Sequence, residues 1–245
     1  MFIDLSHTIE DGLITYKGLP APVICDFLSR EASRRLYAPG TEFHIGRIEM
    51  VANTGTYLDS PFHRFADGKD LSALPLEKLA DLEVVVVRWD AGRGRAIGSR
   101  VFEGRPLRGK AVLVHTGWSA HWRTDRYFEG HPFLTRDAAE YLREAGASMV
   151  GIDSYNIDDT DDMTRPVDEP VELDQWDRCV TILYSRGEGR DDPWSEAVRE
   201  KRDSLETLAR SDYLLCANSV DHRGDGHRTH GISDGGSALP NIHFA

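Results

Sequence analysis

The sequence predicts an α/β fold, with one domain over residues 1–245 that has a mixed central sheet or barrel-like core and outer helices. Three apolar runs rich in β-branched residues are typical of buried strands: 84–89, 111–114 and 148–153. A helical pattern directly precedes the third run, and a helix followed by a strand is half of an α/β unit. A chain of 245 residues is long enough to bury the core of such a domain.

The predicted helices can be placed from their end signals and their apolar spacing. A short helix at 76–82 would lead into the first of the three strands. Thr135 can cap a helix whose apolar face includes Leu142, and Gly146 is a suitable stop just past its end. A second strong helical pattern covers 192–210 and starts at an Asp-Pro pair.

Composition excludes several classes of protein. Apolar residues make up 40% and charged residues 29% of the chain, as in soluble globular proteins, and no apolar run is long enough to span a membrane. The net charge of −12 argues against nucleic acids and anionic membranes as partners. The first residues do not resemble a secretory signal. Three dispersed cysteines form neither a disulfide framework nor a zinc motif, so we expect buried free thiols and a cytoplasmic location.

Residues 53–63 carry the clearest chemical signal of the chain. They follow the apolar run 44–51, which we expect to be a strand leading into the site. Gly55 allows a tight turn, after which Asp59 and His63 could meet one metal ion or one polarised water. The alternative is a tight turn with a capping aspartate and a surface histidine.

This stretch resembles the signature of the cyclase family of bacterial kynurenine formamidases and isatin hydrolases, which reads His-x-Gly-Thr-His-x-Asp-x-Pro-x-His. The positions that match are Gly55, Thr56, Asp59, Pro61 and His63. Residues 3–7, 16–18, 110–118 and 150–154 also look like segments of this family. The resemblance extends over about 1–167, and 168–245 form a divergent C-terminal part. It implies the swivelling type of α/β architecture and a homodimer or larger assembly.

The resemblance also implies an activity, the hydrolysis of an amide-type C–N bond in a small molecule. Family substrates are N-formyl arylamines or strained lactams, and kynurenine formation in tryptophan catabolism is the family-level expectation. Metal ions in such sites bind a water, lower its pKa and polarise the carbonyl. By this resemblance His63 is the general acid/base and Asp59 is a metal ligand.

The chain departs from the signature where the family has metal-binding histidines. Asn53 and Tyr57 replace two of them, and Asp168 stands where a later histidine is expected. An amide oxygen is a harder and weaker ligand than an imidazole, and tyrosine binds metals poorly unless its phenol ionises. The affinity for Zn²⁺ should therefore fall, and a site with Asp59 and His63 should favour Mn²⁺ or Mg²⁺, or hold no ion.

Three hypotheses stay open. The first, which we favour, is an amidohydrolase in which His63 moves the proton and Asp59 with Asp168 holds any metal, supported by Asn53 and Tyr57. The second is a non-catalytic binder of small molecules on the same fold. The third is a metal-free hydrolase or lyase in which Tyr57 and His63 share proton transfer. A Tyr57 side chain in a pocket beside Asp59 and His63 would favour chemistry, and one in the core would favour the binder.

Other clusters have less specific interpretations. The acidic residues of 158–162 could chelate a hard cation, but we interpret them as a solvated loop. We interpret 218–245, which contains His222, His227 and His230, as a loop rather than a transition-metal site. Four aromatic residues could line a pocket for a flat aromatic substrate or could be core or dimer contacts: Trp118, Trp122, Tyr127 and Phe128. The chain has neither a Gly-x-Ser-x-Gly motif nor a phosphate-binding glycine loop.

Overall fold

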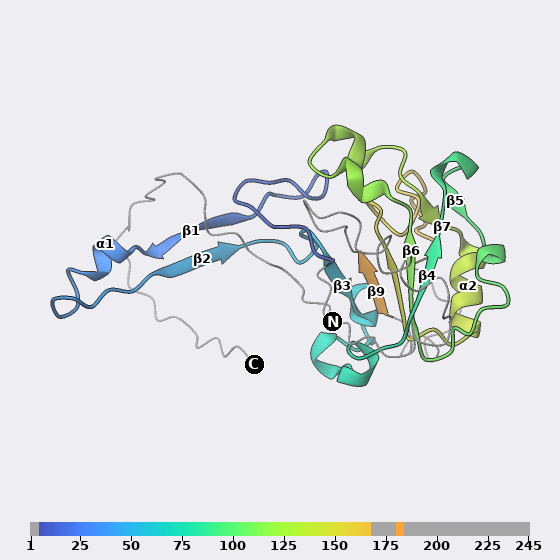
Figure 1. Ribbon diagram of the computed structural model, residues 1–245, viewed down its shortest axis with the longest axis horizontal. Helices are drawn as coiled ribbons and strands as arrows, with labels where there is room; N and C mark the ends of the chain where they lie inside the picture. Colours follow the sequence, from blue (N-terminus) through green and yellow to red (C-terminus); the bar gives the residue numbers. More distant parts are fainter. Residues whose placement is uncertain (1–4, 168–179, 184–245) are drawn as a thin grey trace, which may run out of the picture.

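A five-stranded mixed sheet forms the body of the protein, and a two-stranded arm extends from it (Figure 1). The computed structural model describes residues 5–167 and 180–183. In spatial order the sheet contains β3 (Tyr57–Asp59), β9 (Val180–Leu183), β8 (Met149–Ile152), β6 (Ala111–His115) and β4 (Val84–Arg88). β3 is antiparallel to β9, and the other neighbours are parallel. The predicted α/β class is confirmed, with an open mixed sheet as its centre.

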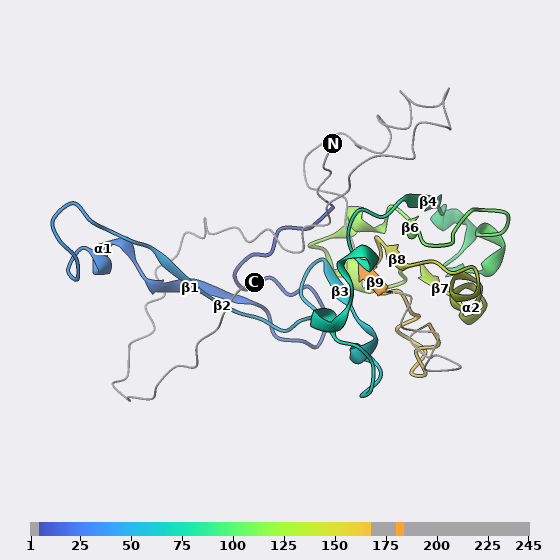
Figure 2. The same cartoon turned by 90° about the horizontal axis from the view of Figure 1, so that it is seen from below.

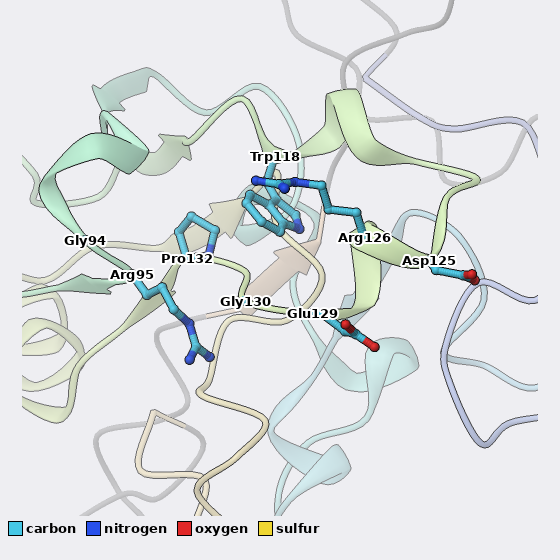
Figure 3. Close-up of a pocket in the computed structure, with 8 residues that line it drawn as sticks. All are labelled: Gly94, Arg95, Trp118, Asp125, Arg126, Glu129, Gly130 and Pro132. Atoms are coloured by element: carbon cyan, nitrogen blue, oxygen red, sulfur yellow. The ribbon is translucent and has the colours of Figure 1, made fainter.

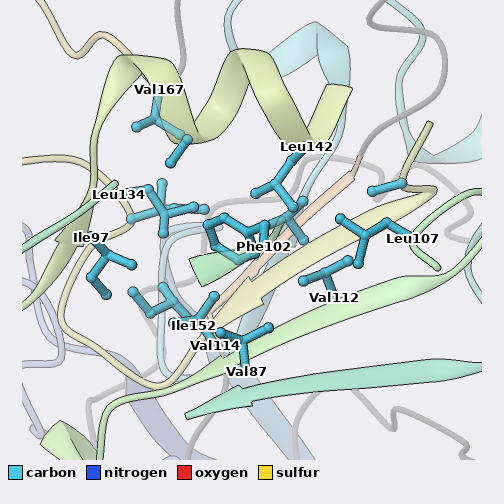
Figure 4. Packing of buried hydrophobic residues seen from close by; sticks show 14 residues of the cluster. Val87, Ile97, Phe102, Leu107, Val112, Val114, Leu134, Leu142, Ile152 and Val167 are labelled. Carbon is cyan, nitrogen blue, oxygen red and sulfur yellow. The ribbon is translucent and has the colours of Figure 1, made fainter. Parts of the chain in front are cut away.

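The three predicted buried strands are β4, β6 and β8, and apolar side chains cover both faces of this part of the sheet. On one face, the helix α2 (Arg136–Glu144) packs on a cluster that includes Val112, Val114 and Ile152 (Figure 4). On the other face, Leu113 packs in a second cluster under the loop that follows β3. Burial on both faces is the reason that these strands are continuous β-branched runs.

The helix predicted before the third strand is confirmed as α2, but its start differs chemically from the prediction. Thr135 occupies the N-cap position without capping through its side chain. Its hydroxyl, with one hydrogen to donate, lies within hydrogen-bond distance of the Ile97 carbonyl at 3.1 Å and of Asp137 Oδ1 at 2.5 Å. Asp137 also accepts from the backbone N–H of Ser99 at 2.9 Å, and these bonds lower its pKa to about 2. Gly146 has a φ of 78°, as expected of a residue that ends a helix in the left-handed conformation.

Short elements complete the body. The helix predicted at 76–82 is reduced to the single 3₁₀ turn Leu76–Lys78. β5 (Ala96–Ile97) pairs in parallel with β7 (Phe133–Leu134) beside the main sheet. The other 3₁₀ turns are Pro61–His63, Leu71–Ala73, Ala91–Arg93, Ser99–Val101, Trp118–His121 and Asp125–Phe128. None of the helices that the structure describes is long and apolar enough to cross a membrane.

The arm is an antiparallel hairpin of β1 (Val23–Leu28) and β2 (Ile45–Glu49), with α1 (Arg30–Ser33) between them (Figures 1 and 2). The strand expected within 44–51 is confirmed as β2, which precedes the Gly55 turn along the chain; it pairs with β1 in the arm and not with the main sheet. All five residues of β2 are exposed. Cys25 lies in β1 and is half-buried, so the expected burial of this thiol is wrong.

Several predictions concern residues that the structure does not describe. The helix expected at 192–210, the loop expected at 218–245 and its three histidines lie outside the described residues. Of the divergent part 168–245, the described residues are those of β9.

Candidate functional site

The turn at Gly55 packs tightly against the N-terminal segment of the described chain. Gly55 has a φ of 67°, and its N–H donates a hydrogen bond to Thr15 Oγ1 at 3.0 Å. A Cβ at this position would lie 2.9 Å from Cγ1 of Ile9, which is fully buried. The backbone N–H of His7 donates to Thr56 Oγ1 at 3.2 Å. The glycine is thus required both by the backbone conformation and by the close approach of Ile9.

β3 places Tyr57 and Asp59 on the same face of the sheet, because alternate residues of a strand share a face. Pairing with β9 puts Asp59 opposite Thr181, which in turn lies beside Val150 of β8. Tyr57 is half-buried and packs against the core cluster on the α2 side of the sheet. A Tyr57 side chain that packs against the core is the arrangement expected of the small-molecule binder, and a role of Tyr57 in proton transfer stays a prediction.

Asp59 and His63 face each other across the 3₁₀ turn Pro61–His63. His63 Nδ1 lies 3.5 Å from Asp59 Oδ1, which is within ion-pair distance. The Asp59 side chain is 25% exposed and that of His63 is 45% exposed. Burial raises the pKa of the Asp59 carboxyl, and the charge that His63 can carry acts in the opposite direction. The pair therefore combines a shielded carboxylate with an imidazole that a solvent molecule or substrate can reach.

The described residues do not complete a metal site. Among them, no group of three or more His, Cys, Asp or Glu side chains is placed to hold an ion. Asn53 is half-buried before the Gly55 turn, and Asp168 lies outside the described residues. Of the predicted ligands, the structure brings together Asp59 and His63, which is fewer than the three protein ligands usual for catalytic zinc.

A buried polar centre at the carboxyl ends of β6 and β8 was not predicted from the sequence. Asp153 is fully buried and accepts hydrogen bonds from the N–H and hydroxyl of Thr116, both at 2.6 Å, and from the N–H of Gly117 at 2.8 Å. Burial raises the pKa of Asp153, whereas His115 at 3.9 Å and these hydrogen bonds oppose that shift. The sequence did contain a signal for this centre, because a polar residue follows each of the two strands. The carboxyl ends of neighbouring parallel strands lie at the same edge of a sheet, so these polar residues come together.

The predicted aromatic residues belong partly to the core and partly to a pocket. Trp118 and Tyr127 are buried with Tyr155 in a separate aromatic cluster, to which Trp122 and Phe128 add partly buried rings. Trp118 also lines a pocket of about 660 Å³ (Figure 3). The other residues that line it are Gly94, Arg95, Asp125, Arg126, Glu129, Gly130 and Pro132. Its lining carries charges of both signs, and the Arg126 guanidinium lies 5.6 Å from the centre of a Trp118 ring.

The acidic loop at 158–162 is held by specific interactions. Arg95 Nη2 lies 3.0 Å from Asp159 Oδ1 and 3.4 Å from Asp161 Oδ2. Asp158 is fully buried and accepts a hydrogen bond from the N–H of Val167 at 2.7 Å. The interpretation as a solvated loop is therefore wrong for Asp158, and Arg95 supplies the positive charge beside two of the other carboxylates.

Comparison with known proteins decides the family. The Cyclase family model matches residues 3–159. The chain belongs to the cyclase family. Kynurenine formamidase of Bacillus cereus is 28% identical over 162 residues, which are 66% of this chain and 72% of the relative. Kynurenine formamidase of Bacillus anthracis is 28% identical over 163 residues, with the same coverage.

Solved structures show the same fold. An isatin hydrolase bound to the product analogue thioisatinate has a TM-score of 0.55 at 18% identity, covering 75% of this chain and 79% of its own. A potential metal-dependent hydrolase with cyclase activity has a TM-score of 0.54 at 22% identity, covering 74% and 79%. The family resemblance seen in the signature is confirmed. Family membership and the curated relatives support an enzyme that hydrolyses amide-type C–N bonds.

Proposed function

We propose that this protein hydrolyses an amide-type C–N bond in a small aromatic molecule, with an N-formyl arylamine as its substrate class. The observation that carries the proposal is the Asp59–His63 pair at 3.5 Å on the cyclase signature. Relatives at 28% identity are named kynurenine formamidase, which supports a formamide as the scissile group. Kynurenine formation in tryptophan catabolism is the corresponding reaction that we propose for this chain.

In this proposal His63 is the general acid/base. Water adds to the carbonyl carbon and gives up a proton to the imidazole, which then protonates the leaving nitrogen as the C–N bond breaks. The products are a carboxylic acid, formate in the case of a formamide, and an arylamine. Asp59 orients the imidazole and stabilises its charged form between the two proton transfers. Tyr57 supports the bound substrate from the same face of β3.

A divalent ion, Mn²⁺, Mg²⁺ or Zn²⁺, remains part of the proposal. When bound, such an ion would activate the water and polarise the carbonyl. Asp59 and Asp168 are its proposed ligands, with Asn53 as a neutral oxygen donor, and the metal-dependent hydrolases among the structural neighbours support this assignment. The described side chains alone do not form the ligand set, so no step above depends on the ion.

A second candidate function is the binding of a small molecule without catalysis. The observation that favours it is the position of Tyr57, which packs against the core cluster on the α2 side of the sheet. Two family histidines are also replaced in this chain, by Asn53 and Tyr57. A protein of this kind would bind an N-formyl arylamine and release it unchanged.

We also propose that the protein is a cytoplasmic homo-oligomer and that the arm is its contact surface. A two-stranded hairpin is marginally stable on its own in water. The arm nevertheless exposes large apolar side chains, including Phe27 at 64%, Ile45 at 46% and Ile48 at 46%. A second copy of the chain that packs on the arm would bury these side chains.

The proposed function is tested by formate release from an N-formyl arylamine, measured for the full chain and for two matched histidine variants. His63→Ala should reduce turnover about 10²- to 10⁴-fold with an unchanged thermal melting curve, because it removes proton transfer without disturbing the core. His44→Ala is the control, since His44 is also paired with an aspartate, Asp26 at 2.7 Å, but lies on the arm. Turnover in His63→Ala equal to that of the unchanged protein would remove His63 from the mechanism.

A further inference from the structure

His7 and Trp122 bury polar atoms that have no hydrogen-bond partner among the described residues. His7 is 3% exposed, and neither of its ring nitrogens is bonded there. The indole nitrogen of Trp122 is also buried and without a partner in this part of the chain. The two rings are stacked, with centroids 4.0 Å apart and planes 6° from parallel. Three unpartnered polar atoms therefore lie together in one stacked pair.

The protonation state of His7 determines which hydrogen-bond donors and acceptors the pair offers. Burial, together with the neighbouring charge of Arg123, lowers the pKa of His7 to about 3, so its imidazole is neutral at physiological pH. A neutral imidazole offers one N–H donor and one acceptor nitrogen, and an indole offers a donor alone. The pair thus presents two donors and one acceptor, and it is best matched by a group with acceptor oxygens.

The pair lies next to the signature segment. The backbone N–H of His7 bonds to Thr56, the residue before Tyr57. The centroids of the Trp122 and Tyr127 rings lie 5.1 Å apart in an edge-to-face arrangement. Through its stacking on Trp122, His7 therefore borders the aromatic cluster of Trp118, Tyr127 and Tyr155.

Local structure holds the pair in place. Arg123, directly after Trp122, has a φ of 66°, a conformation that costs a non-glycine residue energy. Its guanidinium pairs with Glu10, which ties the Trp122 loop to the segment that carries His7. A protein keeps unpartnered buried donors at a cost in stability, and a ligand that accepts their hydrogen bonds is one reason for keeping them.

We propose that His7 and Trp122 form a recognition site that donates hydrogen bonds to an acceptor oxygen of the substrate, either a carbonyl or a carboxylate oxygen. The inference rests on the proposed function for the aromatic amide nature of the ligand. It assigns to His7 and Trp122 a role in binding, separate from the proton transfer assigned to His63. Arg123 favours a carboxylate through its charge, but its pairing with Glu10 weakens that preference.

Binding is measured by isothermal titration calorimetry of the full chain with two probes, 2-aminobenzoate and 2-aminobenzamide. The first carries a carboxylate and the second a neutral carbonyl on the same ring. The variants are His7→Phe and Trp122→Phe, which keep a flat ring for stacking and remove the polar atoms. Trp89→Phe is the matched control, because its indole N–H already bonds to the carbonyl of Gly94 at 2.9 Å.

The unchanged protein should bind at least one probe, and the probe that binds identifies the oxygen type. His7→Phe and Trp122→Phe should each weaken that binding about tenfold, the effect of losing one hydrogen bond to the ligand. Trp89→Phe should bind as the unchanged protein does. His7→Phe should melt at the same or a higher temperature than the unchanged protein, because it deletes buried polar atoms without partners, whereas Trp122→Phe also loses packed ring volume and should melt somewhat lower. With an N-formyl arylamine, both site variants should raise KM and leave kcat nearly unchanged.

Two results would overturn the site: no binding of either probe by the unchanged protein, or unchanged binding in both variants. Unchanged binding with a lowered melting temperature of His7→Phe would show that the pair holds an internal water instead. Failure of the hydrolase proposal is distinguishable from both. Probe binding that depends on His7 and Trp122 without any formate release would keep this site and remove the hydrolase.

Discussion

The substitution Gly55→Ala tests whether the signature turn is set by its contact with the N-terminal segment. An alanine with a φ near 67° pays the left-handed penalty of about 1–2 kcal/mol. Its Cβ would also lie 2.9 Å from Cγ1 and 3.2 Å from Cδ1 of the buried Ile9, and such overpacking costs about 1–3 kcal/mol. The free energy of unfolding should therefore fall by about 2–5 kcal/mol in urea denaturation followed by fluorescence.

Gly104→Ala is the matched control for the backbone term. Gly104 has a φ of 71°, and a Cβ there would meet no atom within 4 Å, so its substitution should cost about 1–2 kcal/mol. In an Ile9→Ala background, Gly55→Ala should cost no more than this control does. Equal losses for Gly55→Ala and Gly104→Ala in the unchanged background would refute the contact with Ile9.

Three further predictions concern Asp59, Asp153 and the arm. Because burial raises the pKa of Asp59, the folded chain binds this proton more tightly than the unfolded chain, and stability falls as pH rises through the folded-state pKa. Asp59→Asn should thus have a higher melting temperature than the unchanged protein at pH 7, and the difference should disappear below about pH 4. A lower melting temperature of the variant at pH 7 would contradict the effect of burial on Asp59. Asp153→Ala should lower the free energy of unfolding, measured by urea denaturation, by about 3–5 kcal/mol, because it leaves the buried donors of Thr116 and Gly117 unpaired. A loss under about 1 kcal/mol would contradict the stabilising role of Asp153. The double variant Phe27→Ser/Ile48→Ser should lower the mass seen by light scattering to that of one chain, whereas an unchanged oligomeric mass would place the contact elsewhere.

The parts of the fold that local sequence determines were predicted well. β4, β6 and β8 follow from runs of β-branched residues, and α2 follows from its apolar spacing and from Gly146. The end chemistry of α2 was not predictable, because the hydroxyl of Thr135 is engaged by a carbonyl 38 positions earlier in the chain. Local sequence patterns show which residues are apolar, but they do not show which distant residues contact them in the fold.

The position of the arm was also not predictable from local sequence. An apolar run such as 44–51 is typical both of a strand in a core and of a strand on an exposed surface that another chain covers. In the described part of the chain β2 pairs with β1 and all five of its residues are exposed, so it is not a core strand, and its cover by a second copy stays a proposal. Hydrophobicity alone cannot separate these cases.

In the candidate site, Asp59 and His63 were predictable as neighbours because four positions and one 3₁₀ turn separate them. The pairing of Asp153 with Thr116 was not, since 37 positions separate the two residues and the parallel order of β6 and β8 brings them together. A role for His7 was not predictable from residues 3–7, because stacking on Trp122 depends on the folded path of the chain.

The central claim is hydrolysis of an amide-type C–N bond, and the most direct measurement is the initial rate of formate release from an N-formyl arylamine. The full chain should be assayed after dialysis, with and without added Mn²⁺, beside the uncatalysed reaction. Turnover should be well above the uncatalysed rate, with one arylamine formed per formate released. A rate equal to the uncatalysed reaction under both conditions would contradict the hydrolase and leave the small-molecule binder as the function of this fold.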